Sequence, residues 1–122
     1  MLNKVTLIGY LGDDVELKDG DNLRAHASLA TAERWNDGDG ETQERTEWHN
    51  LTIWGKSAEY FAQLKKGDLI YVEGKIRYRQ WEGDDGQTRY RTEIHIETYR
   101  TLRRKEEAPK KATTTRRKKK AA

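Results

Sequence analysis

The sequence predicts an all-β domain, a small barrel of five strands with one short helix between the third and fourth strands. Three observations favour this class. Short stretches of alternating apolar and polar residues recur along the chain, and clusters of Gly, Asp and Asn separate them. A single short stretch has apolar residues at helical spacing. The 122 residues suffice for one domain with one modest core.

The first two predicted strands cover residues 3–11 and 23–32. A short extended piece at residues 15–18 lies between two turn signals. Small residues in the second strand indicate close packing. Residues 33–41 combine two glycines with several carboxylates and cannot bury a core, so we expect a mobile loop there.

The third predicted strand, at residues 45–54, has an unusual outer face. Leu51 and Ile53 lie on one face, whereas Trp48 and Trp54 stand among polar groups on the other. Leaving a large apolar side chain unburied costs about 1.5–3 kcal/mol. Two exposed indoles therefore indicate a flat partner such as a nucleobase. A second sheet that buries both faces is the alternative.

A short helix is expected after Gly55, with Ser57 as its N-cap and Gly67 at its end. Lys65 and Lys66 would then lie in the last turn, where the helix dipole favours cations. The apolar stripe of this helix consists of Tyr60, Phe61 and Leu64.

The fourth predicted strand, at residues 68–81, carries a row of cations on its outer face. The residues expected to face inward are Ile70, Val72, Gly74, Ile76 and Tyr78. The outer row consists of Lys75, Arg77 and Arg79 and ends at Trp81. Each two-residue step spans roughly 6.6 Å, so the row is about two nucleotide spacings long. A solvated strand face is the alternative for the cations alone.

The fifth predicted strand covers residues 88–98, after a hairpin loop at 82–87. Its expected inward residues are Tyr90, Ile94 and Ile96, and its expected outward residues are Arg89 and Arg91. We assign residues 1–102 to one domain. Residues 103–122 lack hydrophobic periodicity and are expected to form a disordered basic tail.

The charge of the chain is divided between these two parts. Residues 103–122 contain ten Lys/Arg against two Glu, or +8, which leaves 14 basic and 19 acidic residues, or −5, in the domain. A polyanion must therefore bind a local basic patch. The chain has no cysteine, no long apolar run and no signal-peptide pattern. We expect a cytoplasmic, nucleoid-associated protein that does not enter a membrane.

The predicted element order is strand, strand, strand, helix, strand, strand. This is the order of the OB-fold, a five-stranded Greek-key barrel whose open face and loops bind oligonucleotides. Other small barrels remain possible on this evidence.

Several motifs resemble those of bacterial single-stranded DNA-binding proteins, and together they span about residues 3–97. They are Asn3-Lys4-Val5-x-Leu7-Ile8-Gly9-x-Leu11-Gly12-x-Asp14, Ala30-Thr31-Ala32-Glu33-Arg34-Trp35, Thr46-Glu47-Trp48-His49, Trp54-Gly55-Lys56, Ala58-Glu59, Lys66-Gly67-x-x-Ile70-Tyr71-Val72-Glu73-Gly74-x-x-Arg77-x-Arg79-x-Trp81 and Arg89-Tyr90-x-Thr92-Glu93.

The resemblance implies roles for particular residues. The residues matching base-stacking aromatics of the family are Trp35, Trp48, Trp54 and Trp81. The resemblance also implies a homotetramer. The positions implied at a subunit interface are Asn3, Val5 and Leu7 of the first strand, together with His49.

The basic end of the chain departs from the family pattern. Members commonly end in a short acidic segment that recruits replication and repair enzymes, whereas this chain ends Arg-Arg-Lys-Lys-Lys-Ala-Ala. The opposite charge argues against recruitment of proteins through this tail. Two roles stay open, since the tail can add DNA affinity or dock on the acidic domain.

The predicted function is sequence-independent binding and protection of single-stranded DNA during replication, recombination and repair. Bases stack on the four tryptophans. The phosphates are attracted by Arg34, Lys56, Lys75, Arg77, Arg79 and Arg89. No cofactor, metal or catalytic residue is expected, because the acidic residues of the loops are typical of solvated turns. The alternatives are an RNA-binding or primosome-accessory barrel and, less favoured by the pattern, a metal-dependent nuclease.

Overall fold

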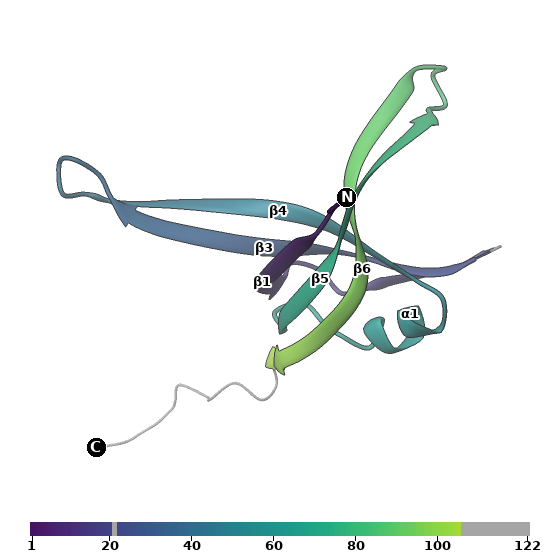
Figure 1. Cartoon of the computed structure of the whole chain (residues 1–122), viewed down its shortest axis with the longest axis horizontal. Helices are drawn as coiled ribbons and strands as arrows, with labels where there is room; N and C mark the ends of the chain where they lie inside the picture. Colours follow the sequence, from purple (N-terminus) through teal and green to yellow (C-terminus); the bar gives the residue numbers. More distant parts are fainter. Residues whose placement is uncertain (21, 106–122) are drawn as a thin grey trace.

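The computed structural model describes residues 1–20 and 22–105. Figure 1 shows a central barrel from which two long hairpins project. The elements are β1 (Val5–Leu11), β2 (Glu16–Asp19), β3 (Leu23–Asn36), β4 (Thr42–Trp54), α1 (Lys56–Phe61), β5 (Leu69–Glu82) and β6 (Thr88–Arg103). The last strand thus reaches one residue into the segment expected to be a tail. Residues 104 and 105 of the predicted disordered tail are also part of the described structure, where the Lys105 N–H donates to the Asp68 carboxylate at 2.9 Å. The rest of the predicted tail, residues 106–122, lies outside the described residues.

The strands form one sheet in the order β1-β5-β6-β4-β3-β2, and a further pairing of β1 with β3 closes it. The closure joins Tyr10 to Ala30 and Leu11 to Leu29. All pairings are antiparallel except β4 with β6. Five long strands therefore make a mixed barrel with one short helix before β5, which confirms the predicted OB-fold. The extended piece expected at 15–18 is β2, paired to the edge of β3.

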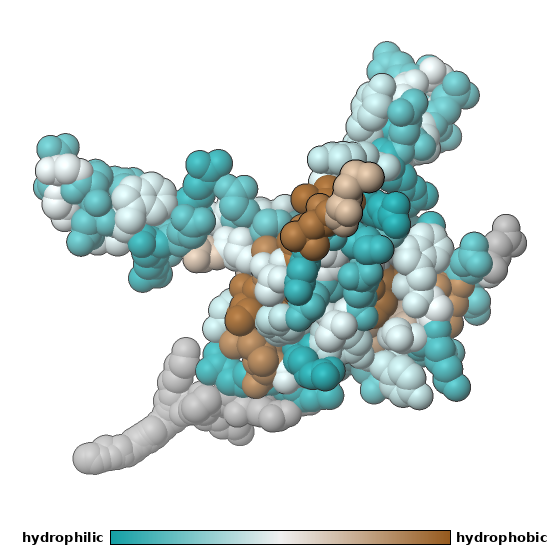
Figure 2. Space-filling view, viewed as in Figure 1, coloured by the Kyte–Doolittle hydropathy of each residue, from teal (hydrophilic) through white to brown (hydrophobic). Residues whose placement is uncertain are grey.

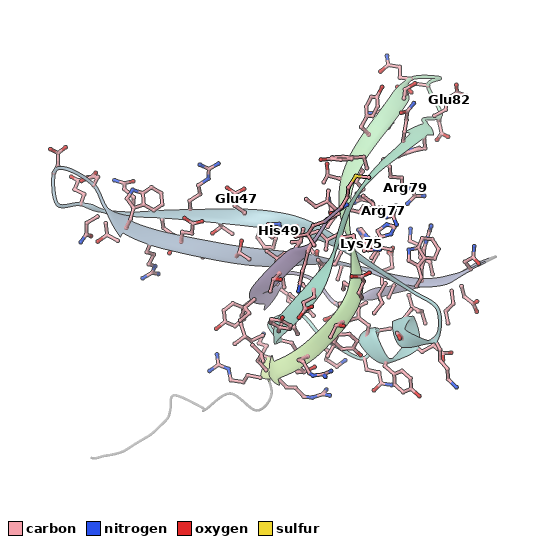
Figure 3. The ribbon with its side chains drawn as sticks, viewed as in Figure 1. Glu47, His49, Lys75, Arg77, Arg79 and Glu82 are labelled. Atoms are coloured by element: carbon pink, nitrogen blue, oxygen red, sulfur yellow. The ribbon has the colours of Figure 1, made fainter. Side chains whose placement is uncertain are left out.

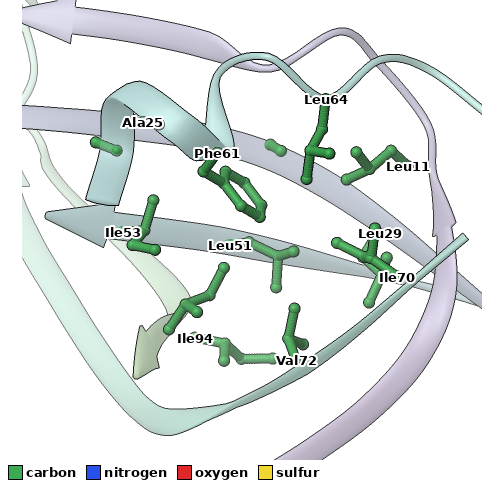
Figure 4. Packing of buried hydrophobic residues seen from close by; sticks show 13 residues of the cluster. Leu11, Ala25, Leu29, Leu51, Ile53, Phe61, Leu64, Ile70, Val72 and Ile94 are labelled. Carbon is green, nitrogen blue, oxygen red and sulfur yellow. The ribbon is translucent and has the colours of Figure 1, made fainter. Parts of the chain in front are cut away.

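The core lies inside this barrel and follows the period of two along each strand. Its buried members include Leu29 of β3, Leu51 of β4, Val72 of β5 and Ile94 of β6 (Figure 4). Phe61 of α1 is fully buried and closes one end of the barrel. Its ring meets Tyr99 edge-on, with 5.0 Å between the ring centroids. Burial of large apolar side chains is the main stabilising contribution to such a core.

Two glycines permit strands to approach more closely than a side chain allows. A Cβ at Gly9 of β1 would lie 2.2 Å from the carbonyl oxygen of Ala30. A Cβ at Gly74 of β5 would lie 2.2 Å from the carbonyl oxygen of His95, beside a register shift between β5 and β6. Closure of the barrel therefore depends on the missing side chains at these positions.

The β3–β4 hairpin corrects the prediction of a mobile loop at residues 33–41. The two strands pair without interruption from Arg24 and Trp54 out to Asn36 and Thr42. The Asp37 carboxylate accepts hydrogen bonds from the backbone N–H of Glu41, the side-chain amide of Gln43 and the backbone N–H of Asp39, and these bonds, in that order of size, lower the pKa of Asp37. The loop is thus a tight turn held by one carboxylate.

The β5–β6 hairpin corrects the prediction that Ile76, Tyr78 and Tyr90 face inward. All three are exposed, and Tyr78 has 81% of its surface accessible. Beyond Gly74 the two strands leave the barrel as a projecting arm (Figure 1). No second layer covers that arm within the described part of the chain, so both faces of the two-stranded arm are exposed to solvent.

The helix is shorter than predicted. The N-cap is Gly55, whose φ is 81°, and not Ser57 as expected, since Ser57 lies inside the helix. No side chain of the described residues makes a capping hydrogen bond at this end. The helix ends at Phe61 rather than near Gly67, and no basic residue lies in its last turn. Successive tight turns follow, because the N–H groups of residues 63 and 64 bond three residues back. No helix in the described ranges has the length and apolar content needed to cross a membrane.

We expect Gly9→Ala to lower the free energy of unfolding by about 1–3 kcal/mol, as overpacking does. The added methyl group would overlap the Ala30 carbonyl at the closure of β1 on β3. Chemical denaturation measures the change. Gly38→Ala is the matched control, because a Cβ there meets nothing within 4 Å. Equal unfolding midpoints for the two variants would contradict the closure argument.

Candidate nucleic-acid interface

The four tryptophans all lie at the surface. The exposed fractions are 46% for Trp35, 63% for Trp48, 42% for Trp54 and 41% for Trp81. The prediction of outward-facing indoles is confirmed, and among residues 1–20 and 22–105 no second sheet covers them. Most large side chains with this much apolar area are buried, so the exposure indicates a binding surface.

The side chain of Trp48 is supported from below by the backbone. It stands on β4 opposite Ala30. A Cβ at Gly12 would lie 2.3 Å from the Trp48 ring, so the ring rests against the bare glycine. Trp48, Asn50, Tyr90 and Arg91 are among the residues that line a hollow of about 340 Å³ beside it. Glycine at residue 12 therefore sets where this indole lies.

Trp54 borders a hollow of about 410 Å³ between β3, β5 and β6. The other lining residues are Arg24, Arg77, Tyr78, Arg79, Glu93 and His95. The Arg24 guanidinium lies 5.5 Å from the Trp54 ring centroid, within cation–π range. The His95 and Trp54 ring centroids are 6.2 Å apart. Three residues predicted from sequence, Trp54, Arg77 and Arg79, thus meet at one hollow.

The predicted row of cations is present on β5. Lys75, Arg77 and Arg79 follow one another up the strand toward the tip of its arm (Figure 3). Lys75 pairs with Glu97 at 3.4 Å, and the Arg79 guanidinium is 3.6 Å from the Glu93 carboxylate. Arg77 has no ion pair among the described residues. Arg79 also lies 5.7 Å from the centroid of Trp81, which joins the row to that indole.

Two further predicted cations lie on the arms and are paired there. Arg89, opposite Trp81 in the β5–β6 register, is 2.9 Å from Asp85. Arg34 is 2.7 Å from Glu44 on the β3–β4 arm, next to Trp35. Because the two arms diverge (Figure 1), Arg34 and Trp35 form a separate group away from the β5 row.

Lys56, the remaining predicted cation, lies exposed at the start of α1, directly after Gly55. Figure 2 shows the arms as mainly hydrophilic, with apolar groups gathered over the central body. Within residues 1–20 and 22–105 no group of His, Cys, Asp and Glu is arranged to hold a metal ion.

The sequence prediction missed Lys18, Arg24, His26 and Arg91. With Thr52, Arg79 and Glu93, these residues line a further hollow next to Trp54. Burial is the largest cause that lowers the pKa of His26, and the Arg91 charge is the next. Arg24 is paired with Trp54 across β3 and β4, a relation that residue spacing in either strand alone does not reveal.

The residues expected at a subunit interface have partners within the chain. The Asn3 side chain donates to the Ile76 carbonyl at 2.9 Å and accepts from the Ile76 N–H at 3.0 Å. Val5 and Leu7 are half-buried and pack against the core. The His49 Nε2 and Thr31 Oγ1 atoms are hydrogen-bonded at 2.9 Å. The outward apolar residues of β1 are instead Ile8 and Tyr10.

An OB-fold barrel whose arms carry exposed indoles beside guanidinium groups is the architecture of an oligonucleotide-binding domain. The single-strand binding protein family model matches residues 2–102, so the chain belongs to this family. The family assignment confirms the prediction of a binding protein rather than an enzyme.

Individual relatives agree with the assignment. The single-stranded DNA-binding proteins of Neisseria meningitidis serogroups A and B are both 52% identical over 88 residues, which cover 70% of this chain. The match covers 51% of each relative, so it spans about half their length.

Two solved structures are similar at 31% identity. One is the Plasmodium falciparum SSB complex with ssDNA, with a TM-score of 0.74 over 84% of this chain and 96% of that one. The other is a deletion mutant of the single-stranded DNA binding protein from Thermus aquaticus, with a TM-score of 0.71 over 83% of this chain and 50% of that one.

We expect Gly12→Ala to displace the Trp48 ring, because the new methyl group would occupy its place. The near-ultraviolet circular dichroism of the folded protein should change. The same Gly12→Ala change made in a Trp48→Phe background should alter the aromatic spectrum far less. Similar spectral changes in both backgrounds would show that Gly12 does not position Trp48.

Proposed function

We propose that this protein binds single-stranded DNA without sequence preference and protects it during replication, recombination and repair. The observation that carries the proposal is the row Lys75, Arg77 and Arg79, flanked by exposed Trp54 and Trp81. Family membership and the likeness to a solved complex with ssDNA support it. With such a ligand, we place the protein in the cytoplasm with the nucleoid.

Stacking provides the selectivity for unpaired strands. Each base stacked on an aromatic side chain contributes about 1–3 kcal/mol, whatever its sequence, because every base has a flat face. Duplex DNA keeps those faces inside its own stack. A strand held on the indoles is also prevented from pairing again or folding into hairpins. The protein thus acts by capture and needs no chemical step.

The ion pairs of the site determine how easily each cation reaches a phosphate. Exposed pairs such as Lys75–Glu97 and Arg89–Asp85 are worth about 0–1 kcal/mol, so phosphates can displace their carboxylates. Arg77 has no carboxylate to displace within the described residues. Arg79 is different, because its partner Glu93 is buried. Arg77 is therefore the leading phosphate ligand of the row.

Homotetramer formation is part of the proposal, and the outer face of β1 and β5 supports it. Ile8 and Tyr10 expose apolar surface there. Beside them the Tyr71 hydroxyl donates to the Glu73 carboxylate, which also lies 3.5 Å from the Lys4 ammonium. An apolar strand face with a fixed polar rim is suited to contact a second copy. Asn3, Val5, Leu7 and His49 would support this face from within the subunit.

We expect Trp81→Ala to weaken binding of oligo-dT by about 1–3 kcal/mol at every salt concentration, with an unchanged salt slope. Arg77→Ala should make the slope of log affinity against log salt shallower by about 0.7, because one phosphate contact is lost. Quenching of tryptophan fluorescence by oligo-dT measures both. Absence of quenching in the unmodified protein would defeat the stacking mechanism.

Competition separates DNA from RNA as the preferred ligand in the same assay. Oligo-dT should displace a bound fluorescent strand at lower concentration than oligo-U of equal length. Stronger displacement by oligo-U would favour the RNA-binding alternative. Displacement by a DNA duplex as strong as by oligo-dT would contradict recognition by stacking.

Light scattering should give the mass of four chains, with and without a dT oligomer of some tens of nucleotides. Tyr10→Glu should reduce the mass, because a charge would be buried at the proposed contact. Tyr60→Glu is the matched control, since Tyr60 is also an exposed tyrosine but lies on α1, away from β1. A monomeric unmodified protein, or equal loss in both variants, would contradict the proposed face.

A further inference from the structure

Beside Trp54 lies a cup of charged side chains drawn from four strands. Lys18 comes from β2, Arg24 and His26 from β3, Arg79 from β5, and Arg91 and Glu93 from β6. These residues lie far apart in the sequence and approach one another because β2 pairs with β3, β3 with β4, β4 with β6, and β6 with β5. The cup adjoins the hollow that Trp54 borders, since both share Arg24, Arg79 and Glu93.

The floor of the cup is the carboxylate of Glu93, which is 2% exposed. Its Oε1 lies 3.2 Å from His95 Nε2, and its Oε2 lies 3.6 Å from Arg79 Nη1. Oε2 has no hydrogen-bond partner among the described residues. Removing one partner of a buried charge is strongly unfavourable, so Glu93 holds Arg79 in place. Arg79 is thereby a fixed part of the cup.

The basic side chains that line the cup outnumber the single carboxylate, that of Glu93, at its floor. Lys18 has an exposed partner, Glu16, at 3.3 Å. Arg24 and Arg91 have no ion pair in the described ranges, although both line the cup. The pKa of His26 is lowered by burial first and then by Arg91, which is consistent with a positive surrounding. Unbalanced guanidinium groups around a concave site are suited to bind an anion.

We propose that Arg24 and Arg91 form a phosphate-binding station for the strand that stacks on Trp54. The inference rests on the proposed function and extends it to a site outside the β5 row. Arg24 lies 5.5 Å from the Trp54 ring centroid, so one residue contacts the indole and borders the cup. The cup itself, at about 30 Å³, is too small for a phosphodiester, so the phosphate next to the base on Trp54 lies at the mouth of the cup, on the side of the adjoining hollow of about 410 Å³, where both guanidinium groups bind it. The station continues the strand from β5 toward β2.

The cup variant carries both Arg24→Ala and Arg91→Ala. It is compared with a control variant that loses the same number of positive charges elsewhere. The control removes Arg100 and Lys65, which lie exposed outside the cup and the β5 row. Oligo-dT affinity is measured by fluorescence over a range of salt. The cup variant should have a salt slope shallower by about 0.7, the loss of one phosphate contact. The control variant should keep the slope of the unmodified protein.

The outcomes separate this inference from the proposed function. A slope unchanged in the cup variant, or reduced equally in the control, overturns the station while leaving binding intact. Failure of the unmodified protein to bind oligo-dT would instead defeat the proposed function. Arg24→Lys with Arg91→Lys keeps both charges and should retain most of the slope, which separates charge loss from misfolding.

Proton uptake gives a second readout that needs no arginine variant. A phosphate at the mouth of the cup would raise the lowered pKa of His26, so the complex binds more protons than the free protein. Affinity should therefore increase as the pH falls into the range in which His26 of the complex has taken up a proton and His26 of the free protein has not. The charged groups facing His26 are Glu16 and Lys18 of β2, Arg24 of β3, Arg79 of β5, and Arg91 and Glu93 of β6. His26→Gln should remove this component, and an equal pH dependence in His26→Gln would overturn the station.

Discussion

The close approach of β1 to β3 is the constraint on which the rest of the structure depends. Gly9 lies against the Ala30 carbonyl, where no side chain fits. This contact joins β1 to β3 and turns an open sheet into a barrel, which pairs backbone groups at the edge of β1 that would otherwise stay open. The closed barrel sets the directions in which β3–β4 and β5–β6 leave it. The positions of the exposed indoles follow from those directions.

The arms expose apolar surface because their strands are longer than the barrel they form. A strand buries one face only where another layer covers it, and that layer ends near Gly74 on β5. Beyond this point Tyr78 and Trp81 have accessible faces, and the cations stand beside them. The exposed surface thus arises from excess strand length. Exposing this surface removes few residues from the hydrophobic core, because the core lies inside the barrel.

Burial separates two kinds of ion pair in the candidate interface. The pair of Lys75 with Glu97 is exposed and weak, so it can open for a phosphate. The pair of Arg79 with Glu93 has one partner inside the protein, where an uncompensated charge is costly. The first kind leaves its cation at the surface, where solvent reaches it. The second fixes a guanidinium group against Trp81 and shapes the cup next to Trp54.

The alternation of apolar and polar residues determined the barrel class, the position of the helix and the outward direction of Trp48, Trp54 and Trp81, because these depend on neighbours in the chain. Tertiary structure decided what depends on strand register and crossing. It placed Arg24 opposite Trp54, buried Glu93 and left Tyr78 exposed. The two-residue period of a strand predicts which residues share a face, but it does not predict whether another layer covers that face. That is decided by segments far apart in the chain.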